Sequence, residues 1–311
     1  MSQMKGIIDP LLTDASSMYV PEGCIADSLL PAIKFAQYTG KLGGYGTNHL
    51  RIESTIIGGK GKYRQVESIA RSTQSFTIEG HGLSGMVTKA DYKNVSDPFD
   101  AEKDETMGIS TILLLEKEKA LADALGATAT MTQNTTLSGT GQFSDYTNSD
   151  PVSKFTAAKK AVRDGSGAVA NVAIMEYGVA DVLRYHPQLL DVLGFKYAKA
   201  GGLTNEDLAK ALNVEQVFIP NAVYESAKEG QTSVLAPVWG KIVVFAAIPK
   251  SAQKHQVSLG YNVRIDDGQP RKVYKQSLFN PPGSTEILVE DEYDMLLSNV
   301  LAGYLIKDAI A

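Results

Sequence analysis

The sequence has little of what usually marks a chemical site. It contains one cysteine, Cys24, so a disulfide framework and a zinc site built from several cysteines are both excluded. Its four histidines stand far apart, at positions 49, 81, 186 and 255, and no two have the i, i+4 spacing of metal ligands on a helix. We therefore expect neither a metal ion nor a cofactor.

Charge of one sign is not in large excess either. Lysine and arginine number 30 against 35 aspartates and glutamates, which gives a formal net charge of -5. This excludes a protein held to nucleic acid mainly by its own positive field, although local basic patches remain possible. No apolar run approaches the roughly 18 residues of a membrane helix, and Met1–Pro10 lacks the apolar core of a signal peptide. We expect a soluble protein, made inside the cell, with no membrane partner.

Residues 1–48 carry short apolar clusters that are repeatedly interrupted. Proline at positions 10, 21 and 31 removes backbone donors, and glycine at 40, 43, 44 and 46 loosens the chain. This pattern favours an extended arm over helices. The arm has enough apolar residues to need a surface to lie on, and none is evident within the arm itself.

Residues 49–92 have the pattern of a two-stranded ribbon. Apolar and polar residues alternate over 50–56, a turn rich in glycine and lysine follows at 58–62, and a second polar strand runs to Glu79. Such a ribbon is only marginally stable alone in water, so it must lie on another surface, which could belong to another subunit. The candidate inter-subunit contacts are Ile56, Lys60, Lys62, Tyr63, Phe76 and Ile78.

The strongest helix signal spans residues 98–125. Asp97 suits the N-cap, Pro98 suits the first helical position, and Gly126 suits the end of the helix. Such a helix would be roughly 40 Å long at 1.5 Å per residue. A solvated face is expected at 116–119, where glutamate and lysine alternate. The apolar stripe comprises Ile109, Ile112, Leu113, Leu121, Ala124 and Leu125.

The rest of the chain predicts a mixture of helices and strands, so the expected fold class is α+β. Residues 127–149 are rich in Thr, Ser, Gly and Asn and should form an irregular connection. Asp150-Pro151 opens another helix, and Thr204–Asp207 resembles a capping box. Strands are expected at 169–175, 217–219, 241–248, 273–278 and 286–289, and the nearly all-apolar 241–248 should be central in its sheet.

One glycine run matches a known motif. Gly80–Gly85 fits G-x-G-x-x-G, the dinucleotide fingerprint, whose mechanism needs a strand before it and a helix start after it. Met86–Lys89 does not begin a helix, so a flexible glycine bend is the preferred interpretation. A nucleotide-dependent α/β enzyme that uses this run remains an alternative of a different class.

No constellation of acid, base and nucleophile is evident. Ser84 lacks a G-x-S-x-G elbow. Cys24 has no histidine nearby and suits a small buried apolar side chain, and His186 before Pro187 suits a helix end. The lack of a recognisable catalytic group of residues in a long, structured chain favours a structural protein.

The order of parts resembles a known family. An arm, a projecting ribbon, a long acidic-capped helix and an α/β body follow one another as in the major capsid proteins of tailed bacteriophages, which have the Hong Kong 97-like fold. Five short stretches carry the resemblance in order over nearly the whole chain, namely Ile25–Pro31, Asp97–Asp100, Asn221–Tyr224 with Glu229–Gln231, Val238–Lys241 and Gly303–Asp308.

The resemblance implies named parts. Residues 1–48 would form the N-terminal arm and 49–92 the E-loop. Residues 93–187 and 273–311 would form the P-domain, with a spine helix at about 98–125, and 188–272 would form the A-domain.

The resemblance also implies a role without enzymatic activity. Copies of the chain would form pentamers and hexamers of an icosahedral head around packaged double-stranded DNA, contacted non-specifically. The partners would be a scaffolding protein, a portal and, in some members, a decoration protein. The protein would belong to the virion and be assembled in the host cytoplasm.

Two further points follow from the family. Some members cross-link an E-loop lysine to a neighbour's asparagine, but the sequence identifies no such asparagine for Lys60 or Lys62, and a solvated turn lysine is the default. The same fold also forms encapsulin-like compartments around enzyme cargo, which is the first alternative function.

Overall fold

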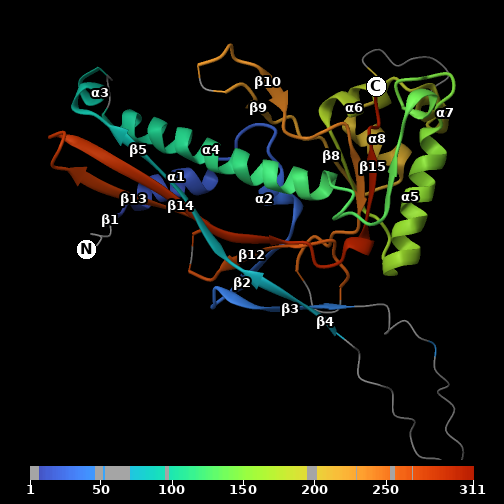
Figure 1. Ribbon diagram of the computed structural model, residues 1–311, viewed down its shortest axis with the longest axis horizontal. Coiled ribbons are helices and arrows are strands. Elements are labelled where there is room, and N and C mark those ends of the chain that lie inside the picture. The colour runs from blue at the N-terminus through green and yellow to red at the C-terminus, as the bar shows by residue number, and fades with distance from the viewer. Residues whose placement is uncertain are drawn as a thin grey trace, which may run out of the picture.

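The computed structural model describes residues 7–45, 52, 71–94, 98–194, 202–228, 230–252, 256–267 and 269–311. Helix α4 (Pro98–Gly126) runs along the molecule, with a six-stranded sheet beside it and a five-stranded sheet at its C-terminal end (Figure 1). Strand β1, the first described element, and the C-terminus lie at opposite ends of this arrangement. Asp97, the expected N-cap of α4, is outside the described residues.

Helix α4 confirms the long helix that the sequence predicts, but the predicted division into buried and exposed faces is only partly correct. Leu113, Lys117 and Leu121 follow one another at intervals of four and are all buried, so they share one packed face. Glu118 is buried as well, so the prediction of a solvated face at 116–119 is wrong for these two charged residues. Ile112, expected in the apolar stripe, is 58% exposed.

The six-stranded sheet is organised around its longest strand, β14 (Ser284–Leu296). The strand order is β1–β13–β14–β12–β2, and β5 also pairs with β14. Alternate side chains of β14 are buried, and Ile287 and Val289 join Leu113 of α4 in one apolar cluster. The other strands are β1 (Ile7–Ile8), β2 (Ala32–Phe35), β5 (Glu79–Val87), β12 (Tyr261–Ile265) and β13 (Arg271–Leu278).

The glycine run at 80–85 lies inside strand β5. This strand pairs antiparallel with β14 over its whole length, so the expected flexible bend is wrong. Helix α3 (Lys89–Asn94) does follow, but the glycines are held in a sheet and do not form a turn at its start. The small size of Gly85 instead lets side chains of α4 approach, because a Cβ there would collide with the Glu105 carboxylate and lie 2.9 Å from Cδ1 of Ile109.

Replacing Gly85 by valine is expected to lower the free energy of unfolding by about 1–3 kcal/mol, the usual cost of overpacking. Urea denaturation measures the change. Gly108→Ala on α4 is the matched control, because nothing lies within 4 Å of a Cβ at that position and alanine favours the helix by about 0.5–1 kcal/mol. An unchanged midpoint for Gly85→Val would contradict the close approach of helix and strand.

The N-terminal segment forms two helices and packs on later parts of its own chain, so the prediction of an extended arm in place of helices is wrong for these residues. Helix α1 (Pro10–Met18) has Asp9 as its N-cap, and it lies against α4 and β13. Strand β1 pairs with β13, and β2 pairs in parallel with β12. Proline begins α1, where its missing N–H costs nothing, and Pro31 follows the short helix α2 (Ala26–Leu29).

The five-stranded sheet has the order β6–β15–β11–β7–β8. Its middle strand β11 (Val243–Ala246) is fully buried, as predicted for 241–248, and the chain's largest apolar core surrounds this sheet. The other strands are β6 (Asn134–Thr136), β7 (Val172–Met175), β8 (Gln216–Phe218) and β15 (Gly303–Lys307). The accompanying helices are α5 (Pro151–Ser166), α6 (Tyr177–Arg184), α7 (Pro187–Val192) and α8 (Asn205–Leu212), and α8 begins with the predicted capping box.

Two small ribbons complete the described fold. Strand β3 (Thr39–Tyr45) pairs with β4 (Arg71–Thr77), and β9 (Val223–Glu225) pairs with β10 (Leu235–Pro237). Short 3-10 helices occur at η2 (Gly139–Gly141) and η3 (Val300–Ala302). Within the described part of the chain, no helix combines the length and the apolar content that crossing a membrane would require.

Candidate functional site

The predicted inter-subunit contacts fall into two groups. Ile56, Lys60, Lys62 and Tyr63 lie outside the described residues.

Phe76 and Ile78 are buried within their own chain, at 3% and 4% exposure. They pack with Tyr261 and Val263 of β12, and the Phe76 ring lies 4.5 Å from that of Phe35 on β2. The prediction that these two side chains face a neighbour is therefore corrected, because the base of the ribbon belongs to the core of the subunit.

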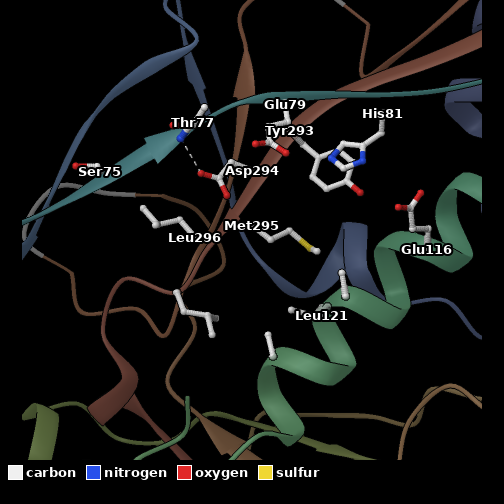
Figure 2. Close-up of a pocket in the computed structure, with 13 residues that line it drawn as sticks. Ser75, Thr77, Glu79, His81, Glu116, Leu121, Tyr293, Asp294, Met295 and Leu296 are labelled. Atoms are coloured by element: carbon white, nitrogen blue, oxygen red, sulfur yellow. Dashed lines mark hydrogen bonds between the residues drawn. The ribbon is translucent and has the colours of Figure 1, made fainter. Parts of the chain in front are cut away.

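A groove opens where β4 of the β3–β4 ribbon and the following strand β5 pass β14 and α4. It has a volume of about 560 Å³, and Figure 2 shows its lining residues converging from these elements. Leu121, Met295, Leu296 and Leu297 supply its apolar lining. This concave surface lies beside the base of the ribbon.

The groove carries three acidic side chains. Glu79, Glu116 and Asp294 all line it, and Asp294 Oδ2 accepts a hydrogen bond of 3.0 Å from the Thr77 backbone N–H. The His81 ring stacks on Tyr293 with ring centroids 4.5 Å apart. Three carboxylates over an apolar lining suit a cationic side chain with an aliphatic stem.

A buried charge cluster lies on the packed face of α4. Lys117 Nζ contacts Asp27 Oδ1 at 2.5 Å and Asp291 Oδ2 at 3.7 Å, and it sits 4.0 Å from the centre of the Tyr293 ring. Arg264 joins the same two carboxylates, at 2.9 Å from Asp27 and 2.7 Å from Asp291. The cluster thus ties α2, α4, β12 and β14 together.

Arg271 of β13 completes the cluster. Its Nη2 donates to the carbonyls of Ser17 and Tyr19, at 3.2 and 2.7 Å, and its Nη1 lies 3.9 Å from Asp27. Burial alone would raise the pKa of Asp27, but the charges of Lys117, Arg264 and Arg271 outweigh burial and lower it. The stabilisation from the ionised Asp27 is therefore complete above the ordinary carboxyl pKa and is lost as the pH falls through the lower folded-state pKa.

Glu118 connects three parts of the chain. Its Oε2 accepts hydrogen bonds from the backbone N–H groups of Ile25 and Ala26, at 2.9 and 2.7 Å. Its Oε1 accepts one of 2.6 Å from Nε1 of Trp239, in the segment between β10 and β11. Burial raises the pKa of Glu118 even though these hydrogen bonds favour its charged form.

Sequence reasoning missed both Lys117 and Glu118. The available signal was their position on the helix. Each lies four residues after a leucine of the buried face, Leu113 or Leu114, and therefore on the same side of the helix. Charged residues at positions that face the core indicate buried partners.

The described nucleophile candidates lack the setting for catalysis. Burial, followed by the charges of Glu118 and Asp27, raises the pKa of Cys24 to about 12, so its thiol stays protonated. His186 caps α7, as predicted for a helix end, and its Nε2 lies 3.0 Å from Ser149 Oγ.

This buried histidine–serine pair has a structural arrangement. Nδ1 of His186 accepts from the Gln188 backbone N–H, so the neutral ring carries its proton on Nε2 and donates it to Ser149. Ser149 Oγ in turn donates to the Asp145 carbonyl at 2.6 Å. A ring that donates to the serine cannot act as its base. Across the ranges that the structure describes, no group of His, Cys, Asp and Glu is placed to hold a metal ion.

Comparisons with known proteins point in one direction. No protein-family model matches the chain. The chain is 24% identical over 300 residues to the major capsid protein of Burkholderia phage BcepMu, covering 88% of this chain and 92% of that protein. It is 27% identical over 243 residues to the major capsid protein of Pseudomonas phage JBD67, covering 77% of each.

Solved structures agree on the fold. A phage-related protein from Bordetella bronchiseptica matches with a TM-score of 0.75 at 22% identity, covering 98% of both chains. An encapsulin from Synechococcus elongatus matches with a TM-score of 0.56 at 8% identity, covering 93% of this chain and 89% of that one. The chain therefore has the α+β Hong Kong 97-like capsid fold and is a relative of phage major capsid proteins.

Proposed function

We propose that this protein is the major shell subunit of a tailed-phage head, assembled as pentamers and hexamers into an icosahedral shell around double-stranded DNA. The observation that carries the proposal is the similarity to the phage BcepMu major capsid protein over nearly the full length of both chains. The role is structural rather than enzymatic.

The proposal includes partners and a location. The subunit would be part of the virion, assembled in the host cytoplasm with a scaffolding protein, a portal and, where present, a decoration protein. Its contacts with DNA would be weak and non-specific, because a chain with a net charge of -5 offers no dominant positive field and its sequence shows no DNA-recognition motif.

The proposal also assigns parts of the chain. Residues 1–48 act as the N-terminal arm and 49–92 as the E-loop. Residues 93–187 with 273–311 form the P-domain, and 188–272 form the A-domain. The docking of 7–35 on its own chain supports an arm that starts from a fixed base.

Within this assignment, the middle of the E-loop contacts a neighbouring subunit through Ile56, Lys60, Lys62 and Tyr63. The acidic groove offers a complementary surface, because its carboxylates suit the ammonium groups and its apolar lining suits the lysine stems.

Electron microscopy of the purified protein, with scaffolding protein present, tests the function directly. Closed shells, or capsomers when the scaffold is absent, are expected, since identical chains that contact one another meet in closed symmetry. A species that stays strictly monomeric in sedimentation at every concentration, with the scaffold present, would refute the proposal.

Deleting residues 53–68 and joining the ends with glycines is expected to abolish stable shells while the subunit keeps its cooperative thermal melt. The deletion removes the four proposed contacts but spares Phe76 and Ile78, which belong to the subunit core. Particle counting by microscopy and thermal melting are read together. The control is Lys228→Ala, an exposed charge outside the E-loop. A normal yield of shells from the deleted chain would contradict the role of the E-loop.

A cellular compartment is the second candidate, favoured by the structural match to the encapsulin. Material purified from the native source separates the two functions. Co-purified DNA and a portal support the phage head, whereas a co-purified enzyme held inside the shell supports the compartment.

A further inference from the structure

The starting observation is that two adjacent residues of α4 serve opposite parts of the fold. Lys117 turns to Asp291 and Tyr293 of the six-stranded sheet, and Glu118 turns to Trp239, which leads into the five-stranded sheet. Both side chains are fully buried. Helix α4 thus holds the two sheets through neighbouring charged groups of opposite sign.

One short N-terminal segment, Gly23–Leu30, touches both of these residues. Asp27 pairs with Lys117, and the backbone N–H groups of Ile25 and Ala26 bind Glu118. We call this segment, together with Lys117, Glu118 and Trp239, the N-terminal joint.

The same segment also reaches the loop before β9 directly. The Asn221 backbone N–H donates to the Gly23 carbonyl at 3.2 Å, and a Cβ on Gly23 would lie 2.8 Å from the Ala222 backbone nitrogen. Gly23 has φ of +87°, a conformation that favours glycine. The segment therefore fits against the five-stranded part with no spare room.

Buried hydrogen bonds and ion pairs of this kind cannot lengthen gradually without a large loss of stabilising free energy. Moving the segment outward would leave Lys117 with Asp291 alone and would leave one oxygen of Glu118 without its two donors, both in a low-dielectric interior. Close-packed interiors respond to such a change by shifting to another arrangement, not by gradual deformation.

We infer that the N-terminal joint couples the packing of residues 23–30 against α4 to the orientation of the five-stranded sheet relative to the six-stranded sheet. When residues 23–30 move away from α4, the hydrogen bond from Trp239 to Glu118 breaks, and the two sheets can change their relative angle. The N-terminal segment is thereby a conformational control element of the subunit.

The first test measures the distance between the two sheets. Spin labels are placed at Lys160→Cys on α5 and Ser277→Cys on β13, both exposed, in a Cys24→Ala background, and labelled chains are diluted with unlabelled ones. Asp27→Asn and Gly23→Ala are each expected to shift the distance distribution beyond the width measured for the parent. Asp14→Asn changes an exposed carboxylate on α1, outside residues 23–30, and should leave it unchanged.

Tryptophan fluorescence gives a second readout, because Trp239 is the single tryptophan and is buried. Asp27→Asn should move its emission to longer wavelength even though no contact joins Asp27 to Trp239 among the described hydrogen bonds and ion pairs. An unchanged distance distribution in both Asp27→Asn and Gly23→Ala, in chains that melt cooperatively, overturns the coupling.

Hydrogen exchange on the unsubstituted protein decides the matter if these variants fail to fold. The coupling requires the amides of residues 23–30 and of 238–242 to open with the same free energy, as one cooperative unit. Separate opening energies for the two segments overturn the proposal without any substitution.

Discussion

Replacing Glu118 by alanine is expected to lower the free energy of unfolding by about 3–5 kcal/mol, because it leaves three donors without their acceptor, two of them buried and one half-buried. These are the backbone N–H groups of Ile25 and Ala26 and the indole N–H of Trp239. Trp239 and Ala26 are 1% and 2% exposed, so their donors are shielded from bulk solvent. Urea denaturation followed by tryptophan emission measures the loss.

Glu116→Ala is the control for this change. Glu116 lies on the same helix, two residues earlier, but its side chain is exposed at the groove. Its replacement should change stability by no more than about 0.5 kcal/mol, as is usual for surface positions. Equal losses from the two substitutions would mean that Glu118 acts only through helix propensity or net charge.

Replacing Phe76 by serine is expected to destabilise the subunit by about 3–5 kcal/mol, the range for removing a large buried aromatic side chain. Phe76 packs on Phe35, Tyr261 and Val263, so the substitution opens a cavity between β2, β4 and β12 and places a hydroxyl in it. Differential scanning calorimetry of the unassembled subunit measures the effect.

Phe279→Ser provides a matched change at a surface. Phe279 is 97% exposed just after β13, and its replacement should alter stability by at most about 0.5 kcal/mol. If Phe76→Ser left the melting temperature unchanged and reduced only the number of shells, the side chain would face a neighbour after all. The expected result makes this substitution unsuitable as a test of assembly.

Structural features that depend on residues close together in the chain were predictable from the sequence. The long helix, the capping box at Thr204 and the buried central strand all follow from short-range patterns of caps and apolar spacing. The resemblance to capsid proteins depended in turn on the order of such elements along nearly the whole chain.

Features that depend on distant partners were missed. Asp27, Lys117, Arg264 and Asp291 are spread over most of the sequence, and each alone has the appearance of a surface charge. Propensity is a weak prior when a tertiary partner is present, and the glycine run at 80–85 became a strand because β14 pairs with it.

The pairing of strands also bears on the timing of synthesis. β1 and β2 find their partners in β13 and β12, and β6 finds its partner in β15, which ends at Lys307. A ribosome releases the first of these strands long before the last, so the six-stranded sheet cannot close before β14 has emerged, nor the five-stranded sheet before β15. Until these late strands emerge, the nascent chain has no finished surface to offer another copy, so folding of the subunit precedes its association.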